Sequence, residues 1–563
     1  MGRRAYAGRR KRRRTRLLTR ALPLGVIAVL AFAGGLVVGG APSRAEHQLV
    51  TNYVRAWARG DYHRMYSLLD PDSRSRVGVG EFVAAYRDAA DTATMVSLAP
   101  GRVGSRQGDF IPVAMRVTTR SFGVLSETLE VPLAGSGSGA HVRFERSLLF
   151  PGLRAGERLV RRAALGPRGT IRASDGTPLA QGPERTSPIP DVAAQIAGML
   201  GPIPPAQAAA YAAEGYPRNA KVGIDGLERV FQTQLAGTPG GTLLAGRRVL
   251  AHVAPRAGQD VTSTIIPRIE RAAVTAMAGR YAGIAVMDPR TGALLALSGV
   301  AFSALQPPGS TMKIVTVTGA LEAGIVKLTD TFPIATEATL DGYRLSNAGG
   351  EACGGTLLNA FAVSCNSVFA PLGARLGASR LVAIAERFGF NQPTMIPGAA
   401  ESQIPPASSI GDDLAVGSSA IGQGKVLASA LQMTDIAATI AMGGRRPIPT
   451  LLAGQPPRFV YVTSPQVAGL VERMMIAVVQ SGTGTAAQIP GVQVAGKTGT
   501  AELGNTTGPG GSSPQNTDAW FVGYAPVGAP RVVAGALFPA AGAGGATAAP
   551  AVHDVLVAAL GAQ

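Results

Sequence analysis

The sequence predicts a multidomain α+β protein that one N-terminal helix attaches to a membrane. Three observations predict this fold class. An uncharged apolar run lies near the N-terminus, directly after a strongly basic segment. Helical periodicity then gives way to alternating strand patterns, which is typical of an α+β domain. The remaining chain mixes strands and helices, and 563 residues are enough for about two to four domains.

Residues 1–20 carry more than half of the excess positive charge. They contain ten Lys or Arg residues and no acidic residue, while the formal net charge of the whole chain is +18. Basic residues that flank a membrane span stay in the cytoplasm, so we predict a cytoplasmic tail here. Because the tail explains most of the charge, the composition does not predict a nucleic-acid-binding protein.

Residues 21–41 are predicted to form a single transmembrane helix. The run ALPLGVIAVLAFAGGLVVGG contains no charge, and about 20 apolar residues span a hydrocarbon core of about 30 Å. A cleaved signal peptide is the alternative, but its apolar region is usually about 7–15 residues long. Pro42 also occupies the place where a small-residue cleavage site is needed. We therefore expect a retained anchor, with the rest of the chain outside the cell.

Residues 45–152 are predicted to form a small α+β domain. Leu49, Tyr53 and Trp57 recur at helical spacing, and a further helical pattern covers residues 81–93. Three strand patterns follow, FIPVAMRVTT, LSETLEVPLA and HVRFERSLLF, and GSGSG separates the last two as a turn.

A second module is predicted over residues 155–250. GPRGTIRASDGTPLA is typical of two short strands joined by a Ser-Asp-Gly turn. IDGLERVFQTQLAGTPGG is typical of one amphipathic helix that is ended by Gly237 and Pro239. Neither segment carries a recognisable set of catalytic residues.

The third region is predicted over residues 258–563. It starts with a strand that runs into a helix, and residues 283–299 have the pattern of a β-hairpin. The two cysteines, Cys353 and Cys365, leave two alternatives open in an exported chain, a disulfide or two buried thiols. Two Cys and five scattered His are too few for a metal site, so we expect no metal cofactor.

The segment QPPGSTMKIV, residues 306–315, places a hydroxyl and an amine one helical turn apart. Ser310 and Lys313 are three residues apart and therefore share a helix face. A serine is a weak nucleophile until a base takes its proton, and apolar surroundings lower the pKa of a lysine so that it serves as a base. On its own, Ser-x-x-Lys is more often an N-cap serine followed by a surface lysine.

Two later segments favour the catalytic interpretation. Residues 364–366 are Ser-Cys-Asn, and residues 497–500 are Lys-Thr-Gly-Thr. In this order the three motifs form the set that is found in penicillin-binding proteins and serine β-lactamases.

The Lys-Thr-Gly-Thr motif follows an alternating apolar run and is predicted to lie on a strand. Alternation puts Lys497 and Gly499 on one side, where a glycine lets a substrate backbone lie against the strand. Thr498 and Thr500 then point away from Lys497, and Thr498 must reach around the strand edge. The backbone N–H groups of Ser310 and Thr500 are expected to donate to an oxyanion.

The chain resembles the class B penicillin-binding proteins, which are monofunctional transpeptidases. The resemblance covers nearly everything after the anchor. GPRGTIRASDGTPLA is similar to the family's RGxIxDRxGxxLA, with Ala173 and Ser174 in place of Asp-Arg, and IDGLERVFQTQLAGTPGG is similar to GLExxxxxxLxGxxG. The segments MDPRTGALLAL, AIGQG and DAWFVGYAP also match.

The resemblance implies four parts after the tail. They are the single transmembrane helix, an NTF2-like domain over 45–152, a pedestal or dimerisation domain over 155–250, and a transpeptidase domain over 258–563. The last is a penicillin-binding, serine β-lactamase-like domain with a central antiparallel sheet flanked by helices. The NTF2-like domain is similar to that of the low-affinity, resistance-type subgroup. The implied location is the cell membrane, with the N-terminus cytoplasmic and the catalytic domain extracellular.

In that family a serine attacks the D-Ala–D-Ala bond of a peptidoglycan stem peptide, and an amine on a neighbouring strand resolves the acyl-enzyme. The resemblance implies Ser310 as nucleophile, Lys313 as base, Ser364 as proton relay, Asn366 as a positioning group, and Lys497, Thr498 and Thr500 as the carboxylate site. It implies that β-lactams acylate the same serine and that no cofactor is needed. No glycosyltransferase domain fits before residue 258, so a SEDS-type glycan polymerase is the implied partner.

Three alternatives stay open. A D,D-carboxypeptidase uses water in place of the acceptor amine and has the same motifs. A serine β-lactamase or β-lactam sensor also shares them, although the chain lacks an ExxLN segment and has Ser-Cys-Asn where one class has SxV. The non-enzymatic alternative is a cell-wall assembly scaffold with a silent site.

Overall fold

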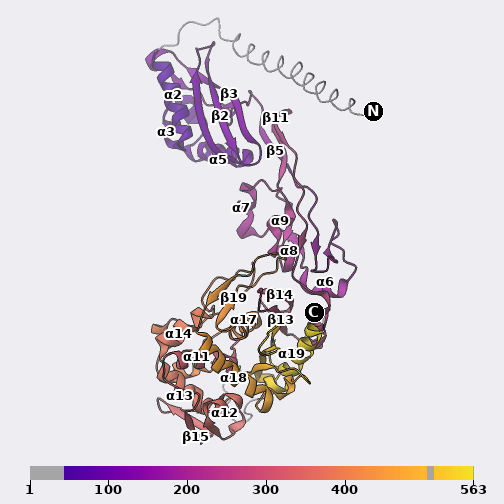
Figure 1. Ribbon diagram of the computed structural model, residues 1–563. Coiled ribbons are helices and arrows are strands. Elements are labelled where there is room, and N and C mark those ends of the chain that lie inside the picture. The colour runs from indigo at the N-terminus through magenta and orange to yellow at the C-terminus, as the bar shows by residue number, and fades with distance from the viewer. Residues whose placement is uncertain (1–43, 504–512, 562–563) are drawn as a thin grey trace, which may run out of the picture. The chain divides into compact units, whose positions relative to one another are not determined.

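The computed structural model describes residues 44–503 and 513–561 (Figure 1). The chain divides into two compact units, which are described separately below. Unit one holds the described residues up to Gly166, Ile203–Ala220 and Gly237–Ala257, and unit two holds Pro167–Pro202, Lys221–Ala236 and the chain from Gly258 onward. The segment expected as one module over 155–250 therefore contributes to both units.

The predicted tail and transmembrane helix, residues 1–41, lie outside the described residues. Within the described part of the chain, no single helix is both long enough and apolar enough to cross a membrane. Among residues 44–503 and 513–561, one pair of helices passes that test together, by length and composition alone. This pair, α13 (Asn366–Leu376) and α14 (Ala378–Arg387), is bent by 98°.

Unit one begins with helices and continues as an antiparallel sheet, as the α+β pattern predicts. The elements are α2 (Arg44–Ala58), α3 (Tyr62–Ser67), α4 (Pro71–Arg76), α5 (Val79–Ala93), β1 (Met95–Val103), β2 (Phe110–Thr119), β3 (Gly123–Ala134) and β4 (His141–Val142), with sheet order β1-β2-β3-β4. The prediction of a third strand over HVRFERSLLF is wrong for most of that segment. Only its first two residues pair with β3, and Arg146–Leu149 form a 3-10 turn that buries Leu148.

Aromatic side chains form the core of unit one where α2 meets α5. Tyr53 and Trp57 of α2 and Phe82 and Tyr86 of α5 are buried, because each helix places them on one face. The Trp57 and Tyr86 rings pack edge to face with centroids 5.1 Å apart. The Tyr53 and Tyr86 hydroxyls lie 2.6 Å apart, so each of these two buried hydroxyls has a partner. A second sheet in this unit has the order β11 (Arg248–Val253), β10 (Gly240–Ala245), β5 (Leu159–Ala164).

In unit two, the segments that precede the catalytic region surround a buried carboxylate. Glu228 is fully buried, and its two oxygens accept hydrogen bonds from Arg168 Nε at 2.7 Å and Arg185 Nε at 2.6 Å. The predicted strand–turn–strand is present as β6 (Ile171–Arg172) and β7 (Pro178–Ala180), which pair with each other. The predicted single amphipathic helix is instead two short helices, α8 (Gly226–Val230) and α9 (Gln232–Ala236), because the chain leaves helical geometry at Phe231.

The centre of unit two is a five-stranded antiparallel sheet. Its order is β14 (Ala293–Gly299), β13 (Gly283–Asp288), β23 (Val532–Phe538), β22 (Thr517–Ala525), β21 (Ala495–Glu502), and β13 and β14 form the predicted hairpin. Every residue of β22 is buried, which requires cover on both faces. Phe521 packs in the core cluster of α10 (Pro267–Met277) and α19 (Gly544–Leu560), and Trp520 and Val522 pack in the cluster that includes α17 (Ala430–Ala441).

A group of helices lies beside the β21 edge of this sheet and brings the sequence motifs together. It includes α11 (Lys313–Glu322), α12 (Leu357–Ala362), α13 and α18 (Pro465–Ser481) (Figure 1). The first eight residues of α11 are all buried, so this helix is the centre of the group rather than a surface helix. The nucleophile motif at its start, the Ser-Cys-Asn motif at the start of α13 and the β21 motif therefore meet at one place.

Candidate active site

The Ser310 segment is a tight turn held between two other segments. Residues Gly309–Met312 form the 3-10 turn η4, in which residues three apart eclipse one another, and α11 follows it. Gly309 has φ +52°, and a Cβ there would lie 2.7 Å from Thr500 O. Gly309 N also donates to Gly422 O of the AIGQG segment at 2.9 Å. The φ angle and the close approach of Thr500 O both require a glycine at this position.

The Lys313 amine is the centre of the site. It lies 2.9 Å from Ser310 Oγ and donates to Ser364 O at 2.7 Å and Asn366 Oδ1 at 2.8 Å. The side chain is fully buried, and the amine lies 5.6 Å from the centroid of the Phe369 ring. Burial, and after it the nearby charge of Lys497, lower the pKa of Lys313 well below its ordinary value.

The lowered pKa of Lys313 favours a neutral amine, and the contacts around it are compatible with that form. Ser364 O and Asn366 Oδ1 are acceptors only, so they take the two N–H groups of a neutral amine. The third contact, at 2.9 Å to Ser310 Oγ, is one that a charged amine donates and that a neutral amine accepts from the hydroxyl through its lone pair. This geometry is what a general base for Ser310 requires.

Ser364 joins the two lysines of the site. Its hydroxyl oxygen lies 2.9 Å from Lys497 Nζ and 3.3 Å from Lys313 Nζ. The backbone of Ser364 has φ +65°, a conformation that a residue with a side chain rarely adopts. Residues in such conformations persist where their surroundings hold them, and they gather at active sites.

Lys497 lies on β21 with its amine buried against the same serine. The amine also donates to Thr498 O at 3.2 Å and lies 5.4 Å from the centroid of the Phe361 ring. Burial lowers the pKa of Lys497 to about 7. No carboxylate pairs with Lys313 or Lys497 among the described residues. When two adjacent amines lack a counter-ion, repulsion favours a state in which one is neutral and the other is charged. The neutral amine can then act as a base, and the charged amine can bind an anion.

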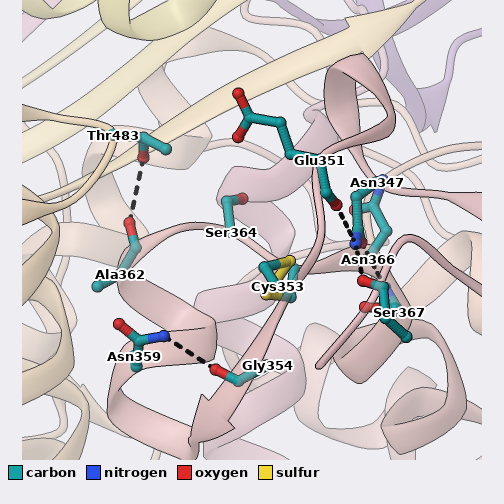
Figure 2. The surroundings of a disulfide bond; sticks show 12 residues. Asn347, Glu351, Cys353, Gly354, Asn359, Ala362, Ser364, Asn366, Ser367 and Thr483 are labelled. Carbon is teal, nitrogen blue, oxygen red and sulfur yellow. Dashed lines mark hydrogen bonds between the residues drawn. A yellow bond between two sulfur atoms is a disulfide. The ribbon is translucent and has the colours of Figure 1, made fainter. Parts of the chain in front are cut away.

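The two threonines of the β21 motif have different hydrogen-bond partners. The Thr498 hydroxyl is hydrogen-bonded to the Thr483 hydroxyl, which also donates to Ala362 O. Figure 2 shows Thr483 directed at Ala362, next to the Ser364 turn. The Thr500 hydroxyl accepts a hydrogen bond from Gly544 N, at the start of α19.

The reason inferred for Gly499 is wrong. A Cβ at this position would lie 2.8 Å from Pro308 O, 2.9 Å from Trp520 Cβ and 3.0 Å from Thr311 Cγ2. The space beside Gly499 is therefore filled by the nucleophile segment and not left for a substrate backbone. The glycine lets the Ser310 turn pack directly against β21.

Several residues of the site carry no sequence signal that identifies them. Thr483, Phe361 and Phe369 belong to no recognised motif, and they reach the site through long-range packing. Cys353 and Cys365 form a disulfide, which resolves the two alternatives that the sequence left open. No cluster of metal-ligating side chains occurs in the part of the chain that the structure describes.

Comparisons with known proteins agree with this geometry. The penicillin-binding protein transpeptidase domain family matches residues 282–557, and the penicillin-binding protein dimerisation domain family matches residues 172–261. The chain is 32% identical to the peptidoglycan D,D-transpeptidase PbpA of Mycolicibacterium smegmatis over 60% of this chain and 79% of that protein.

Solved structures give the same result. The D,D-transpeptidase domain of a peptidoglycan glycosyltransferase from Eggerthella lenta has a TM-score of 0.58 and 30% identity, covering 71% of this chain and 99% of that chain. The penicillin G acyl-enzyme complex of penicillin-binding protein A from M. tuberculosis has a TM-score of 0.56 and 30% identity, covering 70% and 99%. With the three motifs assembled around Ser310, these likenesses establish that the chain belongs to the class B penicillin-binding proteins.

Proposed function

We propose that the protein is a membrane-anchored serine D,D-transpeptidase that cross-links peptidoglycan stem peptides through an acyl-enzyme on Ser310. One observation carries this proposal. A partly buried set of contacts runs from Ser310 Oγ through Lys313 Nζ and Ser364 Oγ to Lys497 Nζ. It offers a nucleophile, a base, a proton relay and an anion-binding cation in that order. The names of the PbpA relatives support the same activity.

Acylation starts when Lys313 accepts the proton of Ser310. Ser310 Oγ attacks the carbonyl carbon of the penultimate D-Ala, and the N–H groups of Ser310 and Thr500 stabilise the oxyanion. The Gly309 contact with Thr500 O supports this pairing, because it brings the two backbones together. Collapse of the tetrahedral intermediate breaks the peptide bond. Ser364, which touches both lysines, carries the proton from Lys313 toward the departing D-Ala amine.

The terminal carboxylate of the donor peptide binds at Lys497, with Thr498 beside it. Lys497 has a pKa lowered to about 7 by burial, and an arriving carboxylate favours its charged form. A β-lactam places its own carboxylate in the same position, which explains why it acylates the same serine. The acceptor amine of a neighbouring stem peptide then attacks the ester, with Lys313 again taking the proton. Asn366, whose Oδ1 already contacts Lys313, positions the donor amide.

Four finer features belong to the same proposal. Residues 21–41 anchor the protein, the catalytic domain lies outside the cell, and a SEDS-type polymerase supplies the glycan strands. The helices and four-stranded sheet of unit one form an NTF2-like domain of the kind found in the low-affinity, resistance-type subgroup. The order of helices followed by antiparallel strands supports this assignment.

The proposal is tested by intact-mass measurement of the full chain in detergent after incubation with benzylpenicillin. The wild type is expected to gain one lasting adduct, and Ser310→Ala is expected to gain none. Ser303→Ala is the matched control, because Ser303 is exposed in the same unit and takes no part in the site, and it should react like the wild type.

The product of a stem-peptide reaction separates the remaining alternatives. Release of D-Ala together with a cross-linked product in the presence of an amine acceptor supports the transpeptidase. Release of D-Ala with only the hydrolysed peptide indicates a carboxypeptidase, and rapid loss of the penicillin adduct with drug consumption indicates a β-lactamase. If the protein gains no adduct and releases no D-Ala, the proposal is contradicted, and the non-enzymatic scaffold is the alternative that remains.

A further inference from the structure

The middle residue of the Ser-Cys-Asn motif is covalently tied to another segment. Cys365 is fully buried and forms a disulfide with Cys353 of β18 (Cys353–Thr356), with a Cα–Cα distance of 5.8 Å. Figure 2 shows the disulfide beside Ser364 and Asn366. Because neighbours along the chain share a backbone, this bond acts on the two motif residues on either side of Cys365.

Those two neighbours are the groups that hold the catalytic amine. Ser364 O and Asn366 Oδ1 accept the hydrogen bonds of Lys313 at 2.7 and 2.8 Å. Ser364 does so from the rarely occupied left-handed conformation at φ +65°. Such a conformation is unfavourable for a residue with a side chain and persists only where the surrounding structure constrains it. The disulfide at Cys365, the next residue in the chain, supplies such a constraint.

The loop before Cys353 is tied to the same turn by hydrogen bonds. Asn366 Nδ2 donates to Ser346 O at 3.0 Å, and Ser367 N donates to Asn347 Oδ1 at 2.8 Å. Asn347 Nδ2 in turn donates to Glu351 O at 2.9 Å. Figure 2 shows Asn347 hydrogen-bonded to both Glu351 and Ser367. The loop and the motif therefore form one cross-linked unit, and the disulfide is its covalent part.

We propose that the Cys353–Cys365 disulfide is a positioning element for acylation, which holds the Ser364 carbonyl and the Asn366 amide against the Lys313 amine. Its reduction by a dithiol slows acylation of Ser310 without unfolding the protein. This inference rests on the proposed function of Ser310 and adds a dependence on the thiol–disulfide state outside the cell.

The reducing step balances with a dithiol as the electron donor. Cys353 is partly exposed while Cys365 is buried, so a thiolate of the dithiol attacks Sγ of Cys353 and Cys365 leaves as a thiolate that takes up a proton. The second thiol of the donor then displaces Cys353, which also becomes a thiol. Two electrons and two protons pass to the protein, and the donor is oxidised to its own disulfide.

The expected consequence is specific to the base. When the turn relaxes, Lys313 loses its two fixed acceptors and water reaches the amine, so the pKa of Lys313 rises toward its ordinary value. The acylation rate should fall, and the acid limb of its pH profile should move to higher pH. A role in fold stability alone would not move that limb.

The test compares oxidised and reduced forms of the full chain in detergent. The protein is reduced with dithiothreitol, desalted so that no thiol reaches the drug, and checked by alkylation and mass for two free thiols, which are the only two cysteines of the sequence. The rate of acylation by a fluorescent penicillin is then measured across pH, alongside the melting curve. Reduction should slow acylation about tenfold or more, since a 1 Å misplacement costs about 10²-fold, and reoxidation should restore it.

The control variant is the double substitution Cys353→Ala and Cys365→Ala, which should acylate slowly with or without dithiothreitol pretreatment. Equal rates and pH profiles for the oxidised and reduced wild type would overturn the inference and leave the proposed function intact. Loss of the folded state on reduction would overturn it too, because the disulfide would then be a folding element. An oxidised wild type that gains no adduct would overturn the proposed function itself.

Discussion

The substitution Gly499→Ala tests whether the nucleophile is positioned by packing against β21. The added methyl would lie 2.8 Å from Pro308 O and 2.9 Å from Trp520 Cβ, where carbon contacts are optimal at about 3.5–4.0 Å. Neither partner atom rotates away, because one is backbone and the other is a Cβ. The Ser310 turn must therefore move off the strand by roughly 0.5–1 Å. We expect a stability loss of about 1–3 kcal/mol, which is typical of overpacking.

The acylation rate should fall by up to about 10²-fold, because the Ser310 hydroxyl moves relative to its base and to the oxyanion donors. The rate is measured with a fluorescent penicillin and the stability by urea denaturation. Gly469→Ala is the matched control: Gly469 lies in α18 with no heavy atom near its Cβ position, so we expect unchanged acylation and a gain of about 0.5–1 kcal/mol. If Gly499→Ala keeps the wild-type stability and acylation rate and only stem-peptide turnover falls, the glycine serves substrate access and the packing argument is refuted.

Three further predictions follow from the charges and hydrogen bonds of unit two. Burial first, and then the charge of Lys497, lower the pKa of Lys313, so Lys497→Met should move the acid limb of the acylation profile to higher pH; an unmoved limb would contradict this. Thr483→Val removes the partner of the Thr498 hydroxyl and should slow acylation up to about tenfold, at about 0.5–1.5 kcal/mol per hydrogen bond, and Thr483→Ser should restore the rate. Burial raises the pKa of Asp435 from 3.8 to about 7, so the stability that its protonated form contributes is present below pH 3.8 and lost as pH rises through about 7. Asp435→Asn should remove that loss when urea denaturation is compared at pH 5 and pH 8.

Much of the fold is predictable from local patterns, because periodicity reports which side chains are buried. The hairpin of β13 and β14 and the helix α5 match their predicted ranges closely, and α2 contains the predicted helical spacing of Leu49, Tyr53 and Trp57. The errors occur where the pattern is short or broken. Residues 143–150 have strand-like composition, yet Arg146–Leu149 form a 3-10 turn that buries Leu148, and the helix expected after Ile224 breaks at Phe231.

Some contacts of the site are likewise predictable from local spacing, and others are not. The spacing of Ser310 and Lys313 determines that their side chains meet, because residues three apart share one side of a helical turn. The contact of Lys497 with Ser364 joins residues 133 positions apart and depends on how β21 and α12 both pack against α18. No local pattern contains that information.

The sequence by itself therefore determined the reaction class, through the identity and order of three short motifs, and it determined the α+β character of the chain through its periodicity. Only the tertiary structure decided why Gly499 is a glycine, that Thr483 supports Thr498, and that Cys353 and Cys365 are joined. The physical reason is that motif chemistry is carried by residue types within one turn or strand. The pKa of a buried amine and the constraint on a strained turn, in contrast, depend on atoms that come from distant parts of the chain.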